Sequence, residues 1–176
     1  MAVDPLTNPE PLIRRVYSYV AYRVGDGPDA QDITSEAFER ALRGRHTYDP
    51  SRGAPISWLL GIARRCLSDA WAARSIPVAD PSELPDGVDL EDQSIRRLTL
   101  SAAIATLDVR EQELIALRYG ADLTARRIAE VLGMRTNAVE VALHRALVRL
   151  REQLGAEGSP KASDSDAEAT RSSPYL

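Results

Sequence analysis

Apolar residues recur at helical spacing through most of this 176-residue chain. In residues 12–24 they fall at Ile13, Val16, Tyr17, Val20 and Val24. A second stripe runs from Asp29 to Arg43, and a third segment, from about Ile56 to Arg74, is apolar on most sides. Recurrence at every third or fourth residue predicts amphipathic helices, and a helix that is apolar all round usually lies at the centre of a bundle. Residues 11–75 are therefore predicted to form a small helical bundle.

The segment after this bundle has a different character. Residues 76–93 contain three prolines and six carboxylates but no cation, a composition typical of an extended linker. Helical spacing returns over residues 94–155, with a break near Asp108 and a short helix from Arg110 to Tyr119. Residues 156–176, rich in Ser, Ala, Asp and Glu, are predicted to be a disordered tail. No segment alternates as a strand would, so the expected fold is all-α, with two small helical domains joined by a flexible acidic linker.

Three residues in the second helical block have the spacing of a helix-turn-helix. Ala129 is small enough for two helices to approach closely, Gly133 accepts a left-handed turn, and Val139 packs the second helix on the first. The second helix opens at Thr136 or Asn137. In such motifs this helix lies in the DNA major groove with its first turns toward the base edges. Taken alone, the pattern also fits an ordinary helical hairpin.

The charge distribution permits a nucleic-acid partner, although the chain as a whole has a net charge of −4. Residues 11–75 carry ten arginines against seven carboxylates, and residues 124–151 carry six arginines against two carboxylates. Basic blocks of this kind supply phosphate contacts. In the second block we expect them from Arg126, Arg127, Arg135, Arg145, Arg149 and Arg151.

Other classes of protein find little support. Cys66, the one cysteine, and the two histidines, His46 and His144, stand apart from any nucleophile or ligand set, so no catalytic, metal or cofactor site is expected. No apolar run is long enough to span a membrane, and residues 1–10 lack the basic start and apolar stretch of a signal peptide. A single cysteine fits a reducing cytoplasm, where the protein is expected to act.

Three motifs follow one another along the chain. They are AQDITSEAFERAL at residues 30–42, YDPSRG with the following WL and IAR at residues 48–64, and LHRA at residues 143–146. In this order they resemble the extracytoplasmic-function (ECF) group of bacterial sigma-70 RNA polymerase sigma factors. The resemblance implies that residues 11–75 correspond to sigma region 2 and residues 94–155 to sigma region 4.

The resemblance implies a surface for core RNA polymerase in each region. Region 2 of the family binds the clamp helices of the β′ subunit. Asp32 and Glu36, four residues apart on one helix face, would pair there with polymerase arginines. Region 4 packs on the β flap, and Leu114 and Ile115 are the expected contact residues. Without the resemblance, the two carboxylates would be interpreted as a solvated face.

The resemblance also implies two contacts with promoter DNA. Opening of the −10 element traps an unpaired base, which requires an aromatic and basic path for single-stranded DNA. The candidates for this path are Tyr48, Arg52, Arg64 and Arg65. The helix-turn-helix would bind the −35 element. Its candidates are Asn137, Glu140 and Val141 for bases, Arg135 and Arg145 nearer the backbone, and Thr136 and His144 beside them.

Three positions depart from the family pattern. Arg65 stands where relatives often carry asparagine, which changes the expected base pocket. Glu140 and Ala142 stand where lysine and arginine are common. The carboxylate of Glu140 either accepts a hydrogen bond from cytosine N4, and so reads a base, or repels phosphate and weakens binding.

Two alternatives to a promoter-reading sigma factor stay open at this point. A free-standing helix-turn-helix regulator that does not engage polymerase productively would fit Glu140 and Ala142. It would leave the Asp32 and Glu36 face without a role. A protein held mainly by an anti-sigma factor would fit the family, although no residue identifies such a partner. The preferred interpretation is a sigma factor that recruits core RNA polymerase to promoters and helps to open the −10 element.

Overall fold

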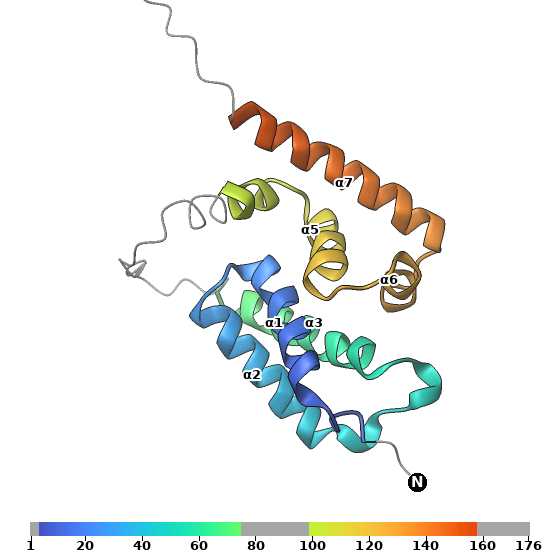
Figure 1. The fold of residues 1–176 in the computed structure, drawn as a ribbon. Coiled ribbons are helices and arrows are strands. Elements are labelled where there is room, and N and C mark those ends of the chain that lie inside the picture. Colours follow the sequence, from blue (N-terminus) through green and yellow to red (C-terminus); the bar gives the residue numbers. More distant parts are fainter. Residues whose placement is uncertain (1–3, 75–98, 158–176) are drawn as a thin grey trace, which may run out of the picture.

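The computed structural model describes residues 4–74 and 99–157, and every regular element in those ranges is helical (Figure 1). The predicted all-α fold class is confirmed. The predicted linker, residues 76–93, lies outside the described residues, as does the predicted tail from residue 158 onward. Within the described ranges, no helix is both long enough and apolar enough to cross a membrane.

Residues 4–74 form the N-terminal bundle. Its helices are α1 (Pro9–Val24), α2 (Pro28–Arg43) and α3 (Pro55–Arg74). Each begins at a proline, whose fixed φ and missing N–H suit the first helical turn. Between α2 and α3 the chain makes two short 3-10 turns, Arg45–Thr47 and Pro50–Arg52. The three helices and the loop predicted here are confirmed.

The buried face of α1 differs from the predicted stripe. Val16, Tyr19 and Val20 are fully buried, whereas Ile13, which the stripe included, is 44% exposed. The stripe also left out Tyr19. The reason is that α1 packs on α2 and α3 on one side and on the C-terminal half of the chain on another, so its buried face is broader than a single stripe.

Residues 99–157 form the C-terminal bundle. Residues 99–105 are helical and are followed by α5 (Val109–Ile115), the π-helical turn η3 (Ala116–Gly120), α6 (Ala125–Leu132) and α7 (Thr136–Glu157). The predicted break near Asp108 is the N-cap of α5, where Asp108 and Glu111 form a reciprocal capping box. Arg149 of α7 bonds Glu111 at 2.5 Å and so ties α7 to α5.

The helix-turn-helix consists of α6 and α7. Gly133 takes the left-handed conformation, with φ of 65°, between them. Ala129 and Val139 are buried at the crossing, as their spacing predicts. Thr124 caps α6 by accepting a hydrogen bond from the backbone N–H of Arg127.

The two bundles pack directly against each other. Helix α1 contacts α5 and η3, and α3 contacts α6; Figure 1 shows α1 and α3 of the lower bundle facing α5 and α6 of the upper one. At the closest point a Cβ added to Gly120 would lie 2.8 Å from the Cα atom of Tyr19. The sequence predicted two bundles joined by a linker and gave no sign of this interface.

Candidate nucleic-acid interface

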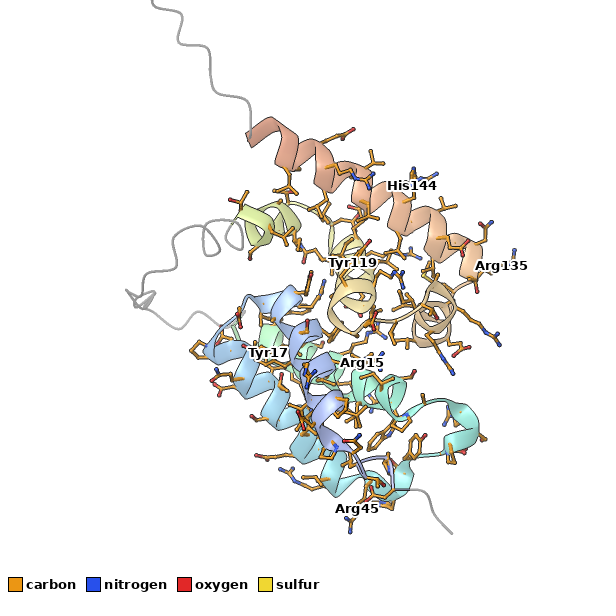
Figure 2. The ribbon with its side chains drawn as sticks, in the orientation of Figure 1. Arg15, Tyr17, Arg45, Tyr119, Arg135 and His144 are labelled. Atoms are coloured by element: carbon orange, nitrogen blue, oxygen red, sulfur yellow. The ribbon has the colours of Figure 1, made fainter. Side chains whose placement is uncertain are left out.

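The outer face of α7 is open to solvent. Figure 2 places Arg135 at the start of this helix and His144 farther along it. The side chains of Arg135 and Arg145 make no hydrogen bond or ion pair with the part of the chain that the structure describes. All seven predicted −35 residues are exposed: Arg135, Thr136, Asn137, Glu140, Val141, His144 and Arg145. This face can therefore enter a groove without first breaking internal contacts.

Three of the six arginines predicted to bind phosphate have carboxylate partners. Arg126 and Arg127 pair with Glu130 at 3.5 and 2.7 Å on the surface of α6. Arg149 pairs with the buried Glu111. Surface pairs are weak and exchange readily for phosphate, so Arg126 and Arg127 stay available. Arg149 has a structural task that its sequence position did not reveal.

Three of the four predicted −10 residues meet in one pocket. Tyr48, Arg52 and Arg64 line a pocket of about 250 Å³ together with Trp58. The rings of Tyr48 and Trp58 lie 5.6 Å apart at 59°, which gives the pocket an aromatic wall. The fourth residue, Arg65, is exposed and lines a separate cleft between the two bundles.

Short polar contacts hold the loop at the mouth of this pocket. The Tyr48 hydroxyl donates to the carbonyl of Gly53 at 3.0 Å. Asp49 accepts hydrogen bonds from the hydroxyl and the backbone N–H of Ser51, which lower the pKa of the Asp49 carboxyl. The bond to Gly53 orients the Tyr48 ring, and the bonds between Asp49 and Ser51 hold the turn that follows it.

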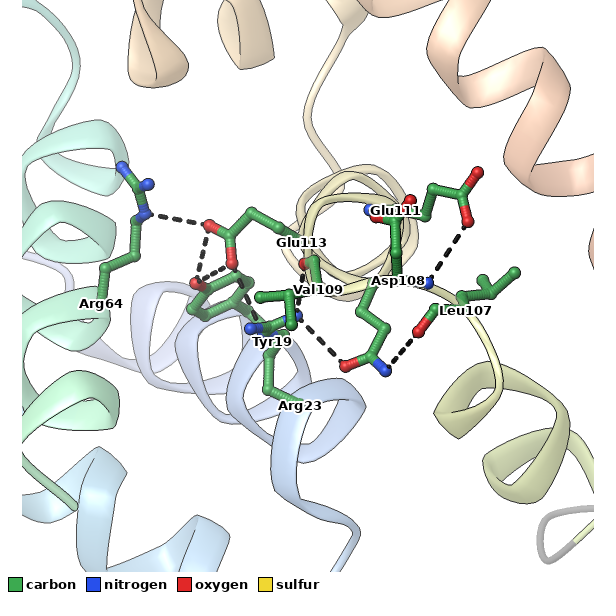
Figure 3. Close-up of polar contacts among 9 residues, drawn as sticks. Tyr19, Arg23, Arg64, Leu107, Asp108, Val109, Glu111 and Glu113 are labelled. Atoms are coloured by element: carbon green, nitrogen blue, oxygen red, sulfur yellow. Dashed lines mark hydrogen bonds and ion pairs between the residues drawn. The ribbon is translucent and has the colours of Figure 1, made fainter. Parts of the chain in front are cut away.

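A polar network at the bundle interface was missed by the sequence analysis (Figure 3). The Glu113 carboxylate accepts a hydrogen bond from the Tyr19 hydroxyl at 3.0 Å and pairs with Arg64 at 2.9 Å and Arg23 at 3.5 Å. Burial, and then the charge of Glu113, raises the pKa of Tyr19 well above its usual range. Spacing could not reveal this network, because Tyr19 and Glu113 are 94 positions apart.

The predicted polymerase residues divide into two groups. Asp32 and Glu36 are exposed on α2, where Glu36 pairs with Arg40 at 2.5 Å. Leu114 and Ile115 are only 0% and 1% exposed, because α5 packs against both α7 and α1. In this arrangement the two apolar residues belong to the core. Their contact with the β flap stays a prediction that requires a different arrangement.

The sequence matches two family models, Sigma-70 region 2 over residues 10–75 and Sigma-70 region 4 over residues 97–150. It is 30% identical over 133 residues to the RNA polymerase sigma-E factor of Streptomyces antibioticus. The matched segment covers 74% of this chain and 73% of that protein. Over 158 residues it is 30% identical to the ECF RNA polymerase sigma factor SigD of Mycobacterium tuberculosis, covering 81% and 73%.

Identity to the ECF RNA polymerase sigma factor BldN of Streptomyces coelicolor is also 30%, over 147 residues. That match covers 79% of this chain, which spans only 56% of BldN.

Two solved structures share the fold. RpoE of Bartonella quintana, in complex with the anti-sigma factor NepR, has a TM-score of 0.62 at 16% identity and covers 83% of this chain and 93% of its own. CnrH, in complex with the cytosolic domain of CnrY, has a TM-score of 0.59 at 21% identity and covers 84% and 82%. The match of the N-terminal bundle to region 2 disfavours a free-standing helix-turn-helix regulator. With both regions matched in order and relatives 30% identical over most of its length, the chain belongs to the sigma-70 family, in its group of ECF RNA polymerase sigma factors.

Proposed function

We propose that this chain binds core RNA polymerase, directs it to promoters through the −35 and −10 elements, and helps to open the −10 DNA. One observation carries the proposal. The described chain presents two surfaces suited to nucleic acid. One is the exposed face of α7, and the other is a pocket whose aromatic and basic side is formed by Tyr48, Arg52 and Arg64 of the N-terminal bundle.

At the −35 element, α7 lies in the major groove with its first turns toward the bases. Asn137, Glu140 and Val141 face base edges, and the Glu140 carboxylate favours a cytosine N4 donor. Arg135 and Arg145, which have no internal partner in the described chain, bind phosphates on either side.

At the −10 element, an extruded base of the non-template strand enters the pocket of about 250 Å³. The Tyr48 and Trp58 rings offer stacking surfaces, and Arg52 and Arg64 hold the flanking phosphates. Arg65, on the same helix, extends the basic path along the strand.

Polymerase binding is assigned to the exposed carboxylates Asp32 and Glu36 against the β′ clamp helices. Leu114 and Ile115 are buried in the described arrangement, so their contact with the β flap would require α5 to be uncovered first. An anti-sigma factor is a further proposed partner, since RpoE was solved with one. The place of action is the bacterial cytoplasm, where polymerase and promoters meet.

The direct test is co-purification with bacterial core RNA polymerase. The wild-type chain is expected to bind, and Asp32→Arg/Glu36→Arg is expected to lose binding by at least about a hundredfold, because two repulsive contacts replace two attractive ones. Glu10→Arg, a charge reversal at an exposed carboxylate of α1, serves as the control and should bind normally. If the wild-type chain does not bind polymerase, the free-standing regulator becomes the better account.

A further inference from the structure

A cleft of about 820 Å³ lies between the two bundles, beside the Tyr48 pocket. The polar network of Tyr19, Arg23 and Glu113 forms its buried side. Sites for small molecules usually enclose about 300–1,000 Å³, so the cleft has the size of such a site. Apart from Arg64 and Arg65, its lining has no part in the contacts proposed above for DNA or polymerase.

The lining of this cleft is strongly cationic. Among its residues one carboxylate, that of Glu113, stands against four arginines: Arg23, Arg64, Arg65 and Arg110. Glu113 pairs with Arg64 at 2.9 Å and with Arg23 at 3.5 Å, so two guanidinium groups share its single charge. Like charges that share a cleft repel one another, and an anion among them removes that repulsion. The charge balance therefore favours an anionic ligand.

The two arginines without a carboxylate come from different bundles. The side chain of Arg65, on α3, makes no hydrogen bond or ion pair with the described chain. Arg110, in the first turn of α5, donates only to the sulfur of Met134, at 3.5 Å, within the described ranges. A thioether sulfur is a weak acceptor, whereas a phosphate accepts two parallel hydrogen bonds from a guanidinium group. Arg65 and Arg110 can thus hold a phosphorylated molecule between the two bundles.

A buried donor of the same cleft also lacks a hydrogen-bond acceptor. The Arg23 side chain is only 2% exposed, and its Nε makes no hydrogen bond with the described residues. The ion pair of this atom with Glu113 Oε2, at 3.5 Å, is too long to count as one. Buried polar atoms are nearly always hydrogen-bonded, to protein, water or ligand. An anion in the cleft would supply an acceptor that the chain does not.

The remaining lining of the cleft is suited to a flat ring. Arg64, Ser68 and Trp71 follow one another at intervals of four and three residues, on one face of α3. The Trp71 residue is 37% exposed, and the Arg23 guanidinium lies 4.9 Å over its ring. Aromatic rings and methionine make favourable contacts with a flat aromatic group. The C-terminal bundle adds three apolar side chains to this wall: Val109, Leu132 and Met134.

A ligand for this cleft must satisfy both kinds of lining. Inorganic phosphate would pair with Arg65 and Arg110 but would leave the apolar wall unfilled. An apolar molecule would leave the same two arginines unpaired. A nucleoside triphosphate carries a flat base and a chain of charged phosphates, and so matches the two parts of the cleft at once.

We propose that the cleft between the bundles is a binding site for a nucleoside triphosphate, with the phosphates on Arg65 and Arg110 and the base against Trp71 and Met134. The proposal does not rest on the promoter function. Because Arg65 and Arg110 belong to different bundles, the bound nucleotide would also hold the bundles together.

The test is isothermal titration calorimetry of the full chain with ATP, AMP and inorganic tripolyphosphate. ATP is expected to bind at least about tenfold more tightly than AMP, because its further phosphates accept additional charged hydrogen bonds. It should bind at least about fivefold more tightly than tripolyphosphate, because only ATP carries a base. ATP should also raise the melting temperature of the chain, since it binds the folded state.

Variants assign the two halves of the site. Arg65→Ala and Arg110→Ala remove exposed side chains, and each should weaken ATP binding by about tenfold. Trp71→Ala should weaken binding of ATP by about fivefold and leave that of tripolyphosphate unchanged. Arg45→Ala is the matched control, because Arg45 is exposed and lies at the end of the N-terminal bundle away from the C-terminal one (Figure 2). Circular dichroism checks that each variant keeps its helices.

Three results would overturn the proposal. One is no binding of ATP to the wild-type chain, or an equal loss in the Arg45→Ala control. Another is equal affinity for ATP and tripolyphosphate, which would mean an adventitious anion only. The third is binding of a single-stranded 12-mer DNA that depends on Arg110 without any binding of nucleotides, which would assign the cleft to a DNA strand. Polymerase binding through Asp32 and Glu36 is measured separately, so each proposal can fail without the other.

Discussion

The two surfaces that we propose for DNA binding differ in how far the rest of the described chain covers them. On α7, Arg135 and Arg145 are exposed and lack partners in the described chain. In the N-terminal bundle, Arg64 is paired with Glu113, and α6 closes one side of the pocket. The proposed −35 surface is therefore open to solvent, whereas the proposed −10 surface is partly covered by the C-terminal bundle.

This difference has a physical rationale. An aromatic and basic pocket binds single-stranded nucleic acid with little regard for sequence. An uncovered pocket would take up unpaired RNA or DNA away from any promoter. Duplex recognition of the kind proposed for α7 depends on base edges, so an exposed α7 would carry less of that risk.

The largest expected effect concerns the packed interface between the two bundles. Tyr19 is fully buried and contacts both bundles, so Tyr19→Ala should cost about 3–5 kcal/mol in the free energy of unfolding, measured by urea denaturation. Tyr19→Phe keeps the ring and loses only the hydroxyl bond to Glu113, at a cost of about 1.5–3 kcal/mol. A loss of less than about 1 kcal/mol in the free energy of unfolding for Tyr19→Ala would show that the interface between the bundles is not packed as described.

The exposed face of α7, the proposed −35 surface, is tested by the double variant Arg135→Ala/Arg145→Ala. Loss of two phosphate contacts should weaken binding to a promoter duplex by roughly tenfold and reduce the slope of log K against log salt by about two. Fluorescence anisotropy over a salt series measures both. Arg14→Ala, an exposed arginine of the other bundle, is the control. An unchanged salt slope would remove these two arginines from the interface.

Variants of the proposed −10 surface should change the affinity for single-stranded DNA less, and by different amounts at Arg64 and Arg65. In the free chain Arg64 is already occupied, so Arg64→Ala should change the affinity for a single-stranded 12-mer by less than about twofold. Arg65→Ala should weaken it by roughly threefold, because Arg65 is exposed. The reverse ranking would contradict the pairing of Arg64 with Glu113.

The smallest expected effect is an expansion of the chain at high pH. The pKa of Tyr19 is raised where the two bundles pack together, so the neutral phenol stabilises their interface. This contribution is fully present below about pH 10, the usual pKa of tyrosine, and is lost as the pH rises further. The charged groups around it are Glu113, Arg23 and Arg64. Small-angle scattering should show expansion above pH 10. Tyr17→Phe, which removes another phenol of raised pKa, should leave that transition in place, and Tyr19→Phe should remove it.

The elements of this fold follow from local signals. Helical periodicity, the break near Asp108 and the left-handed turn at Gly133 each depend on a few neighbouring residues, so the sequence predicts them. The convergence of Tyr48, Arg52 and Arg64 is also largely local, because they lie on one loop and the helix that follows it.

The interface between the bundles has no local signal. Glu113 contacts Arg64 and Tyr19 only when the two bundles are docked. At Gly120 a side chain would clash with the backbone of Tyr19, which is far away in the sequence. The same docking and packing bury Leu114 and Ile115, whose apolar stripe was interpreted as a polymerase contact. Periodicity shows that a face is apolar, but it does not show which surface covers that face.

The most direct test of the described arrangement is the distance between the two bundles in the free chain. Spin labels at Ile13→Cys on α1 and Val148→Cys on α7, both partly exposed, with Cys66→Ala to remove the native thiol, suit double electron–electron resonance. The docked bundles predict one short, narrow distance distribution for the free chain. A broad distribution, as expected from two bundles that move independently, would contradict this arrangement.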